Sequence, residues 1–270
     1  MPFPTQQKTE QARTRQRRPT GMGGQYSRAM FYLLHRLHWP AVCEVCARWP
    51  AQPVCADCYS TFAPLQHRCP ACALPMAPGL ELCVRCREDD TPRWLARCVA
   101  RVDYAYPWTD LVARFKFQQQ PAWAHQFALW MLQAPEAQTL LRQATLLAPI
   151  PSTAERLRER GYNQAWELAT ALRRHSRSHA RTLPDLLLRQ PQSQVQHTLS
   201  AAERQANAHQ SLTLHPGHRR ALQHQRVLLV DDVMTTGTTL QAAAQRLREA
   251  GAHSVSAIVF ARTPAPGSVE

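Results

Sequence analysis

The chain has 270 residues, which is long enough for one sizeable domain and a smaller second one. Its 32 Lys and Arg residues outnumber 19 acidic residues, and the net charge of +13 indicates affinity for polyanions such as nucleic acid, although arginine supplies nearly all of it. Every apolar run is too short for a secretory signal or a membrane-spanning helix, so we expect a cytoplasmic protein without membrane insertion.

Residues 1–38 are predicted to form a disordered, basic extension. The first 28 residues are rich in Gln, Thr, Arg, Pro and Gly, with a basic run from Arg15 to Arg18. Such a composition cannot bury enough apolar surface to offset the entropy of ordering the chain.

Eight of the nine cysteines form four C-x-x-C pairs. Two residues between thiolates is the spacing of a zinc knuckle, and two knuckles complete a tetrahedral site with four sulfur ligands. The short loops between pairs favour sequential pairing, although the spacing also permits an interleaved one. Sequential pairing gives a first site of Cys43, Cys46, Cys55 and Cys58, and a second site of Cys69, Cys72, Cys83 and Cys86.

These two sites predict a double zinc ribbon over residues 39–90, a module in which metal binding supplies folding energy. A disulfide framework or a redox C-x-x-C motif is the alternative, but neither an oxidising compartment nor a thioredoxin-like context is indicated. A zinc ribbon can also bind nucleic acid, and Arg48, Trp49 and Arg85 lie nearby in the sequence. The ninth cysteine, Cys98, is interpreted as a small apolar residue of a strand.

Residues 91–263 predict an α/β domain with a parallel sheet. A strand is expected at 97–106, helices at 108–117 and 123–132, and an extension of that helical layer at 138–143. Lys116 stands near the end of the first helix, between Phe115 and Phe117. A second strand at 145–150 should end near Pro149, because proline cannot donate to a sheet ladder, and Ser152 or Thr153 can cap a helix from Ala154.

The helix after this loop carries Arg156, Arg158 and Arg160, and Gly161 permits a bend before a further helix at 164–174. Arginine forks suit pyrophosphate, whereas the alternative is a solvated charged face. Further on, Ser200 and Glu203 form a capping box for another helix. The histidines around this region lack metal-like spacing and are interpreted as surface residues; they are His197, His209, His215, His218 and His224.

Residues 227–240 organise the domain. Four apolar residues predict a buried strand that ends at Asp231 and Asp232, a loop of threonines and glycine follows, and a helix is expected at 240–250 with Gly251 after it. A loop at the carboxyl end of a strand that leads into a helix gathers free N–H groups and suits a phosphate. A last strand is predicted at 254–260, and the chain from Arg262 onward, with residues 264–270 as a separate tail, is expected to be mobile.

The residues of this loop restrict the class of ligand that it can bind. Gly237 lets the backbone approach an anion closely, and hydroxyl donors surround it from Thr235, Thr236, Thr238 and Thr239. The loop lacks a lysine, and neither a Walker pattern nor G-x-G-x-x-G occurs in the chain, which argues against nucleoside triphosphates and dinucleotides. Carboxylates only accept hydrogen bonds, so the acid pair suits a vicinal diol, with a divalent cation to offset charge.

All 13 positions of 227–239 match the ribose-phosphate motif of type I phosphoribosyltransferases, which this stretch resembles. From Cys43 to Thr263 the chain is similar to the ComF competence-protein family. That resemblance rests on the paired Cys₄ ribbons, Phe-Lys-Phe around Lys116, Pro149-x-Pro151, Arg160-Gly-Tyr-Asn-Gln164, Gln196-x-x-Leu199-Ser200 with Arg204 and Asn207, and the Asp-Asp and Thr-Gly loop. It implies a phosphoribosyltransferase-like domain behind a double zinc ribbon, and a role with single-stranded DNA and competence-machinery proteins in natural transformation.

The resemblance also implies site roles. Asp231 and Asp232 would bind the ribose hydroxyls of phosphoribosyl pyrophosphate or a related ribose phosphate, and Thr235, Thr236, Gly237, Thr238 and Thr239 its 5-phosphate. The pyrophosphate, with Mg²⁺, would meet the loop of Pro149, Ile150, Pro151 and Ser152. The catalytic residues stay unknown, with Lys116, Arg158 and Arg160 as candidates, and zinc would fill two structural sites. An active phosphoribosyltransferase in nucleotide metabolism or salvage is the alternative to a DNA-uptake protein.

Overall fold

A computed structural model describes residues 41–190 and 211–265. Three predictions therefore lie outside the described residues. They are the basic extension, the capping box at Ser200 and Glu203 within the polar segment 193–207, and the final residues 266–270 of the tail. His197 and His209 lie outside as well.

The domain is built on a five-stranded sheet in the order β1-β7-β6-β2-β3, and all neighbouring strands are parallel. Its strands are β1 (Arg97–Asp103), β2 (Leu146–Pro149), β3 (Arg181–Thr182), β6 (Arg226–Met234) and β7 (Ser254–Arg262). Val230 of β6 pairs with Pro149 on one side and Ile258 on the other, so β2 and β6 bring their carboxyl ends together. The predicted parallel α/β fold is confirmed.

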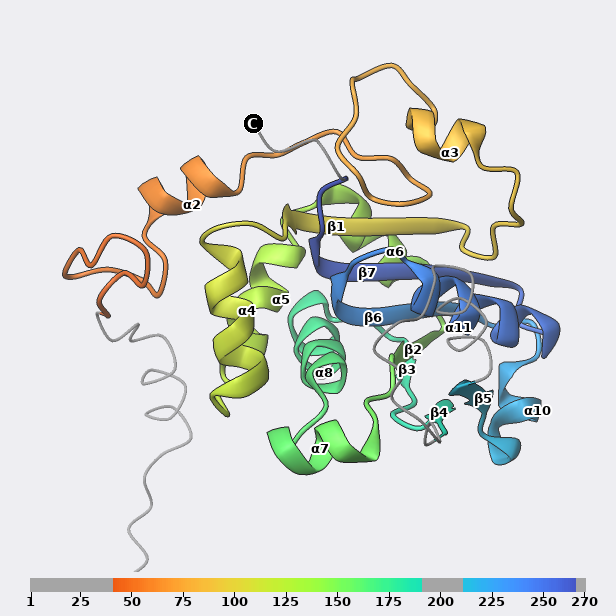
Figure 1. The fold of residues 1–270 in the computed structure, drawn as a ribbon. Coiled ribbons are helices and arrows are strands. Elements are labelled where there is room, and N and C mark those ends of the chain that lie inside the picture. The colour runs from red at the N-terminus through yellow and green to blue at the C-terminus, as the bar shows by residue number, and fades with distance from the viewer. Residues whose placement is uncertain (1–40, 191–210, 266–270) are drawn as a thin grey trace, which may run out of the picture.

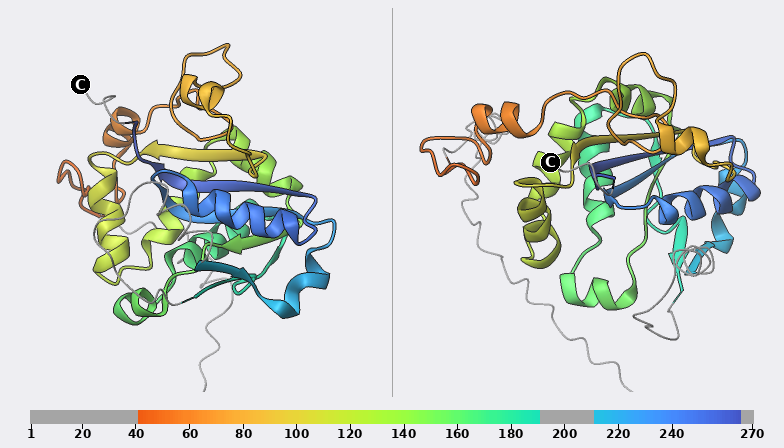
Figure 2. Two further views of the ribbon diagram at one scale, coloured as in Figure 1. Left: turned by 45° about the vertical axis from the view of Figure 1, so that its right-hand side comes forward. Right: turned by 45° about the horizontal axis from the view of Figure 1, so that its top comes forward.

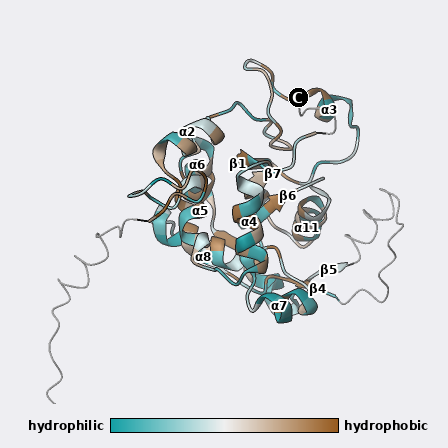
Figure 3. Ribbon diagram, turned by 60° about the vertical axis from the view of Figure 1, so that its left-hand side comes forward, coloured by the Kyte–Doolittle hydropathy of each residue, from teal (hydrophilic) through white to brown (hydrophobic). Residues whose placement is uncertain are grey.

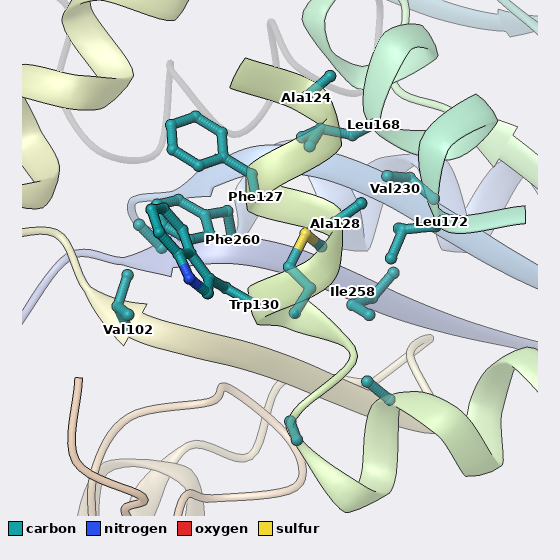
Figure 4. Close-up of a cluster of buried hydrophobic side chains, with 14 of the residues drawn as sticks. Val102, Ala124, Phe127, Ala128, Trp130, Leu168, Leu172, Val230, Ile258 and Phe260 are labelled. Atoms are coloured by element: carbon teal, nitrogen blue, oxygen red, sulfur yellow. The ribbon is translucent and has the colours of Figure 1, made fainter. Parts of the chain in front are cut away.

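Helices cover both faces of this sheet (Figures 2 and 3). One face packs against α4 (Trp108–Phe117), α5 (Trp123–Met131), α6 (Pro135–Gln143) and α8 (Gln164–Ser176). The other face packs against α11 (Thr238–Glu249). The first face has an aromatic core in which Phe127 of α5 stacks on Phe260 of β7 at 4.2 Å between ring centroids (Figure 4).

Smaller elements lie around the sheet in Figure 1. The short helix α7 (Ala154–Arg160) follows β2. A separate two-stranded sheet of β4 (Leu187–Arg189) and β5 (Leu212–Leu214) is antiparallel and leads into η1 (Pro216–His218) and α10 (Arg219–Leu222). The cysteine-rich region contributes α2 (Ala56–Phe62) and α3 (Val84–Glu88).

Three predicted boundaries need correction. Strand β6 does not end at Asp231 and Asp232 but continues to Met234, because its ladder with β7 runs on to Arg262. For the same reason Arg262 is not in a mobile tail; it ends β7 and is 2% exposed. Strand β1 ends at Asp103 rather than at residue 106, because its ladder with β7 ends there. Residues 138–143 lie in a separate helix that begins at Pro135 and packs on the same face as α5, which agrees with the predicted extension of that helical layer.

The first ribbon, residues 41–63, docks on the helical face of α4 and α5. The ring of Tyr59 stacks on Trp130 at 5.4 Å and meets Trp108 edge-on at 6.0 Å. Trp108 Nε1 also donates a hydrogen bond of 2.7 Å to the carbonyl of Phe62. Arg114 of α4 also pairs with Glu44 of this ribbon, so the attachment combines aromatic packing with polar contacts.

The second ribbon, residues 67–88, docks on the edge of the sheet. The N–H of Cys98 in β1 donates to the Pro70 carbonyl at 2.7 Å, and Arg68 Nη1 pairs with Asp103 at 2.8 Å. Cys98 itself is 2% exposed, and its burial raises the thiol pKa to about 12, which agrees with its predicted place as an apolar strand residue. The attachment is mainly polar.

Candidate functional site

The two acids predicted to bind the ligand lie near the carboxyl end of β6. Asp232 is 6% exposed, and its Oδ1 lies 3.3 Å from Nζ of Lys116 at the end of α4. Its other oxygen, Oδ2, is buried and accepts no hydrogen bond from the residues that the structure describes. The structure thus joins Lys116 to the acid pair and leaves one buried carboxylate oxygen free to accept a donor.

The surroundings of Asp231 destabilise its charged form. Burial, followed by the charge of Asp232, raises the pKa of Asp231 to about 7, although Lys116 and Arg189 oppose the shift. Its Oδ1 accepts the Asp232 N–H at 2.9 Å. A carboxylate pair held this close gains from any ligand that supplies hydroxyl donors or positive charge.

The threonine-rich loop follows β6 directly and leads into α11. Gly237 has φ +86°, a left-handed conformation that favours glycine, and it is the residue before the first turn of the helix. Thr236 and Thr238 share a hydroxyl hydrogen bond of 2.8 Å. The helix begins at Thr238 rather than at residue 240, so its free N–H groups lie at the predicted phosphate loop.

The second predicted loop follows β2. Its Ile150 N–H donates to the Val230 carbonyl at 2.9 Å, and Asn163 Nδ2 donates to the Ile150 carbonyl at 3.1 Å. Thr153 is the N-cap of α7 and accepts the Arg156 N–H at 3.2 Å, as one of the two predicted caps. These bonds hold the loop beside β6, where Ile150, Pro151 and Ser152 line the same cavity as the acid pair.

That cavity has a volume of about 360 Å³ and a basic lining. Lys116, Arg156, Arg160 and Arg189 face Asp231 and Asp232 across it. Arg160 also lies over the ring of Phe117, with 4.9 Å from its central carbon to the ring centroid. Four cations against two acids leave the cavity suited to an anion that also carries hydrogen-bond donors.

Not all predicted residues line this cavity. Thr239 does, whereas Thr236 and Gly237 line a neighbouring cleft on the other side of the loop. Arg158 lies outside both, with its Nε bonded to the Ala154 carbonyl at 3.3 Å. Pro149 is the last residue of β2 and pairs with Val230.

Two cations of the cavity, Arg156 and Arg189, were not among the predicted site residues, although Arg156 belongs to the arginine group that the sequence associates with pyrophosphate. Arg156 lies four residues before Arg160 and therefore on the same face of α7, whereas Arg158 projects elsewhere, so helical spacing was a usable signal. Arg189 ends β4, and no sequence feature near it points to Asp231. Its pKa is lowered by burial and then by Arg156.

The eight C-x-x-C cysteines form two clusters in the predicted sequential pairing, which removes the interleaved alternative. In each cluster the four sulfur atoms lie within 4.8 Å of one another. The first cluster is Cys43, Cys46, Cys55 and Cys58, and the second is Cys69, Cys72, Cys83 and Cys86. Four thiols grouped in this way fit a tetrahedral metal site and could hold zinc ions.

In each cluster, backbone N–H groups favour the thiolate form of the first cysteine, which is the form that a metal needs. Burial and the neighbouring thiols raise the pKa of Cys58, Cys72 and Cys86. Burial opposes ionisation of Cys43, but the N–H groups of Cys55, Cys46 and Val45 outweigh it and lower its pKa to about 6. Cys69 shows the same balance, with its pKa lowered to about 7.

His215 and His218, interpreted as surface residues, are partly exposed, and both converge on Asp185. His218 Nε2 lies 2.9 Å and His215 Nε2 lies 3.9 Å from its carboxylate, and the hydrogen bond from His218 lowers the Asp185 pKa. His215 Nδ1 accepts the Gly217 N–H at 3.1 Å, which leaves the proton of the neutral ring on Nε2. This assignment favours a hydrogen-bonded cluster over a metal site through that nitrogen.

No helix of the described residues is long and apolar enough to cross a membrane.

Comparison with known proteins identifies the kind of domain and the relatives of the chain. A family model described as a phosphoribosyl transferase domain matches residues 187–269. The DNA utilization protein YhgH of Escherichia coli strain K12 is 30% identical over 233 residues, which cover 83% of this chain and 98% of that protein. Competence protein F of Haemophilus influenzae is 29% identical over 77% of this chain and 90% of its own length. Competence protein ComFC of Bacillus subtilis strain 168 is 26% identical over 79% and 86%, respectively.

Proposed function

This chain belongs to the ComF competence-protein family, and from that premise we propose that it binds phosphoribosyl pyrophosphate and acts in DNA uptake and natural transformation. One observation carries the ligand proposal. Asp232 Oδ2 is buried without a partner among the described residues, in a basic cavity. A buried acceptor gains most from a donor, and the hydroxyl groups of a ribose are donors.

The placement of the other ligand groups follows from this hydrogen bond to Asp232. Asp231 and Asp232 accept the ribose hydroxyl groups, and the 5-phosphate binds the N–H groups and hydroxyls of the loop from Thr235 to Thr239. Lys116, Arg156 and Arg160 neutralise the pyrophosphate beside the loop of Pro149 to Ser152. Mg²⁺, bound through the pyrophosphate oxygens, offsets part of the ligand's negative charge.

Isothermal calorimetry with phosphoribosyl pyrophosphate and Mg²⁺ tests the ligand. We expect the wild-type chain to give a binding isotherm and Asp232→Asn to weaken it at least tenfold, because an amide loses charge and one acceptor site. Asp185→Asn, which changes a carboxylate outside the cavity, is the matched control and should bind like wild type. Folded wild-type protein that releases no heat would contradict the proposal.

The DNA role rests on charge and on exposed groups beside the cavity. The chain carries a net charge of +13, and α7 presents exposed arginines near Phe117, which is 68% exposed. Arginines contact phosphates and an exposed ring can stack on a base, so single-stranded DNA is the proposed partner, together with proteins of the competence machinery.

Affinity for a single-stranded oligonucleotide at two salt concentrations tests this role. We expect affinity to fall steeply as salt rises, because each phosphate contact releases counterions. Asp231→Ala should leave DNA affinity intact if the strand binds outside the ribose pocket, since deoxyribose lacks the vicinal diol. Affinity that does not respond to salt would contradict a phosphate-based interface.

An active phosphoribosyltransferase is the second candidate, favoured by the cations of the cavity. Lys116, Arg156, Arg160 and Arg189 are placed to stabilise the charge of a departing pyrophosphate, and positioning with charge neutralisation is the catalysis that such a displacement needs. Release of pyrophosphate in the presence of candidate bases tests turnover. Rates equal to a blank without protein would leave binding as the function.

A further inference from the structure

Arg262 occupies an unusual position between the second ribbon and the threonine-rich loop. It ends β7 and is 2% exposed, and burial lowers its pKa. Its Nη1 donates to the carbonyls of Met234 at 3.2 Å and of Thr235, and its Nε donates to the Cys72 carbonyl at 2.8 Å. A buried guanidinium is stable only while such acceptors surround it.

The acceptor at Cys72 is also a member of the second cluster. One side chain therefore joins a metal-ligating residue to the first residue of the proposed phosphate loop. Around it, a cleft of about 320 Å³ separates the second ribbon from Thr236 and Gly237. With open space on that side, the hydrogen bonds of Arg262 carry a large share of the contact between ribbon and loop.

A second link runs parallel to the first. The side-chain amide oxygen of Gln241, in the first turns of α11, accepts the Trp94 N–H at 2.9 Å and the Leu95 N–H at 3.3 Å. Those two residues lie between the second ribbon and β1. The loop is thus tied to the second cluster at Cys72, and the start of α11 is tied to the chain that leaves this cluster.

The first cluster is anchored elsewhere. Its nearest buried arginine, Arg101, donates from Nη2 to the Ala63 carbonyl at 2.8 Å and lies over the Tyr59 ring at 5.1 Å. Those contacts lead to α4 and α5 rather than to the loop. Arg101 is therefore a matched control for Arg262, since both are buried arginines that hold a ribbon carbonyl.

We propose that Arg262 is a positioning residue that couples metal binding at the second cluster to ligand binding at the Thr235–Thr239 loop. This inference rests on the proposed binding of phosphoribosyl pyrophosphate and on zinc at the clusters. When the second cluster loses its metal, the turn that presents the Cys72 carbonyl loosens and Arg262 loses an acceptor. The guanidinium then no longer holds the Met234 and Thr235 carbonyls in one place.

Coupling between two sites is reciprocal, so the ligand must also protect the metal. In the full zinc-loaded chain, we expect phosphoribosyl pyrophosphate with Mg²⁺ to slow zinc transfer to a chelator about tenfold at one cluster only. Cys58→Ser, which keeps only the second cluster intact, should retain this protection, and Cys86→Ser should lose it. Equal protection of both clusters would overturn the proposal.

Substitution of the bridging arginine isolates its part. Arg262→Gln should weaken the protection severalfold while the protein still loads two zinc ions, whereas Arg101→Gln should preserve it. Arg262→Lys serves if the glutamine variant folds poorly, because it retains the charge but cannot reach several carbonyls at once. Full protection in a folded Arg262 variant would overturn the role of this residue.

Hydrogen exchange separates this inference from the proposed function. Without any ligand, Cys86→Ser should accelerate amide exchange in peptides that cover residues 234–240 severalfold, and Cys58→Ser should not. This result is expected even if phosphoribosyl pyrophosphate does not bind. Identical exchange in the two variants would overturn the coupling, while wild-type protein that binds no phosphoribosyl pyrophosphate would overturn only the proposed function.

Discussion

The two ribbons are built alike but are attached to the domain by different forces. In each ribbon, the third cysteine is the N-cap residue of a short helix. Its backbone is extended, with φ −67° and ψ 160° in both ribbons. Its N–H donates to the sulfur of the first cysteine, from Cys55 to Cys43 at 3.3 Å and from Cys83 to Cys69 at 3.5 Å. The local sequence thus sets the geometry of each cluster by itself.

The contacts between each ribbon and the α/β domain show how the two ribbons differ. Figure 1 shows the first ribbon beside the helices of one face and the second ribbon at the edge strand β1. The first ribbon stacks rings on that helical face in addition to its polar contacts with Arg101 and Arg114. The second is held by arginines that bond carbonyl and carboxylate oxygens near the carboxyl edge of the sheet. Apolar contact contributes stability and tolerates small shifts, whereas hydrogen bonds fix position. We infer that the first ribbon mainly extends the core and the second mainly orders the ligand loops.

Removing the aromatic anchor should give the largest effect. Trp108 is 1% exposed and packs against Tyr59, Trp130 and Phe260 with ring centroids 5.3–6.0 Å apart. Trp108→Ala should lower the free energy of unfolding by about 3–5 kcal/mol, because it leaves a large cavity and an unpaired Phe62 carbonyl. Urea denaturation of the metal-loaded chain measures this cost.

Trp108→Phe is the control for the ring itself. It keeps most of the apolar contact and loses the indole hydrogen bond, so about 1–2 kcal/mol should be lost. If both variants cost the same, hydrogen bonding rather than aromatic packing would hold the first ribbon, and the contrast between the ribbons would disappear.

Breaking a polar anchor should cost less. Arg68 bonds Asp103 at 2.8 Å and the Ala73 carbonyl at 3.1 Å, and its side chain is 10% exposed. Arg68→Ala should lower the free energy of unfolding by about 2 kcal/mol, because it leaves a half-buried carboxylate and a carbonyl without this donor.

An exposed ion pair within the first ribbon provides the matched control. Arg48 and Asp57 pair with side chains 59% and 70% exposed, so solvent screens their attraction. Arg48→Ala should leave stability nearly unchanged in the same denaturation experiment. A cost equal to that of Arg68→Ala would mean that burial does not decide the strength of these pairs.

Much of this arrangement could be predicted from the sequence because the signals are local. The helix at Trp108–Phe117 has both predicted ends, since Pro107 marks its start and its apolar spacing is regular. Cysteine spacing gave both clusters, and Thr153 was one of two predicted caps. In each case the deciding contacts lie within fewer than 20 residues along the chain.

The remaining features depend on partners distant in sequence. An arginine at a strand end resembles a surface residue, yet Arg262 is buried because its acceptor at Cys72 lies 190 residues away. Strand β6 continues through Asp231 because that residue pairs with Val259 of β7, a contact that outweighs the low strand preference of aspartate. Arg189 reaches the cavity only through the packing of the separate β4–β5 sheet.

In the cavity beside these polar contacts, a substitution should raise the free energy of unfolding rather than lower it. Asp231 has a folded-state pKa of about 7, above the value of about 3.9 for an unfolded chain. Between those values the folded chain holds a proton that the unfolded chain has lost, so stability falls as pH rises through this window and levels off above about pH 7.

Asp231→Asn removes the charge and should stabilise the ligand-free protein at pH 8 by about 1 kcal/mol, and by less at pH 5. Denaturation at both pH values measures this difference, and calorimetry of the same variant should show weaker binding of phosphoribosyl pyrophosphate because one acceptor is lost. Unchanged stability at pH 8 would mean that the folded protein does not destabilise the charged form of Asp231. The carboxyl edge of the sheet would then differ from the helical face in polarity alone.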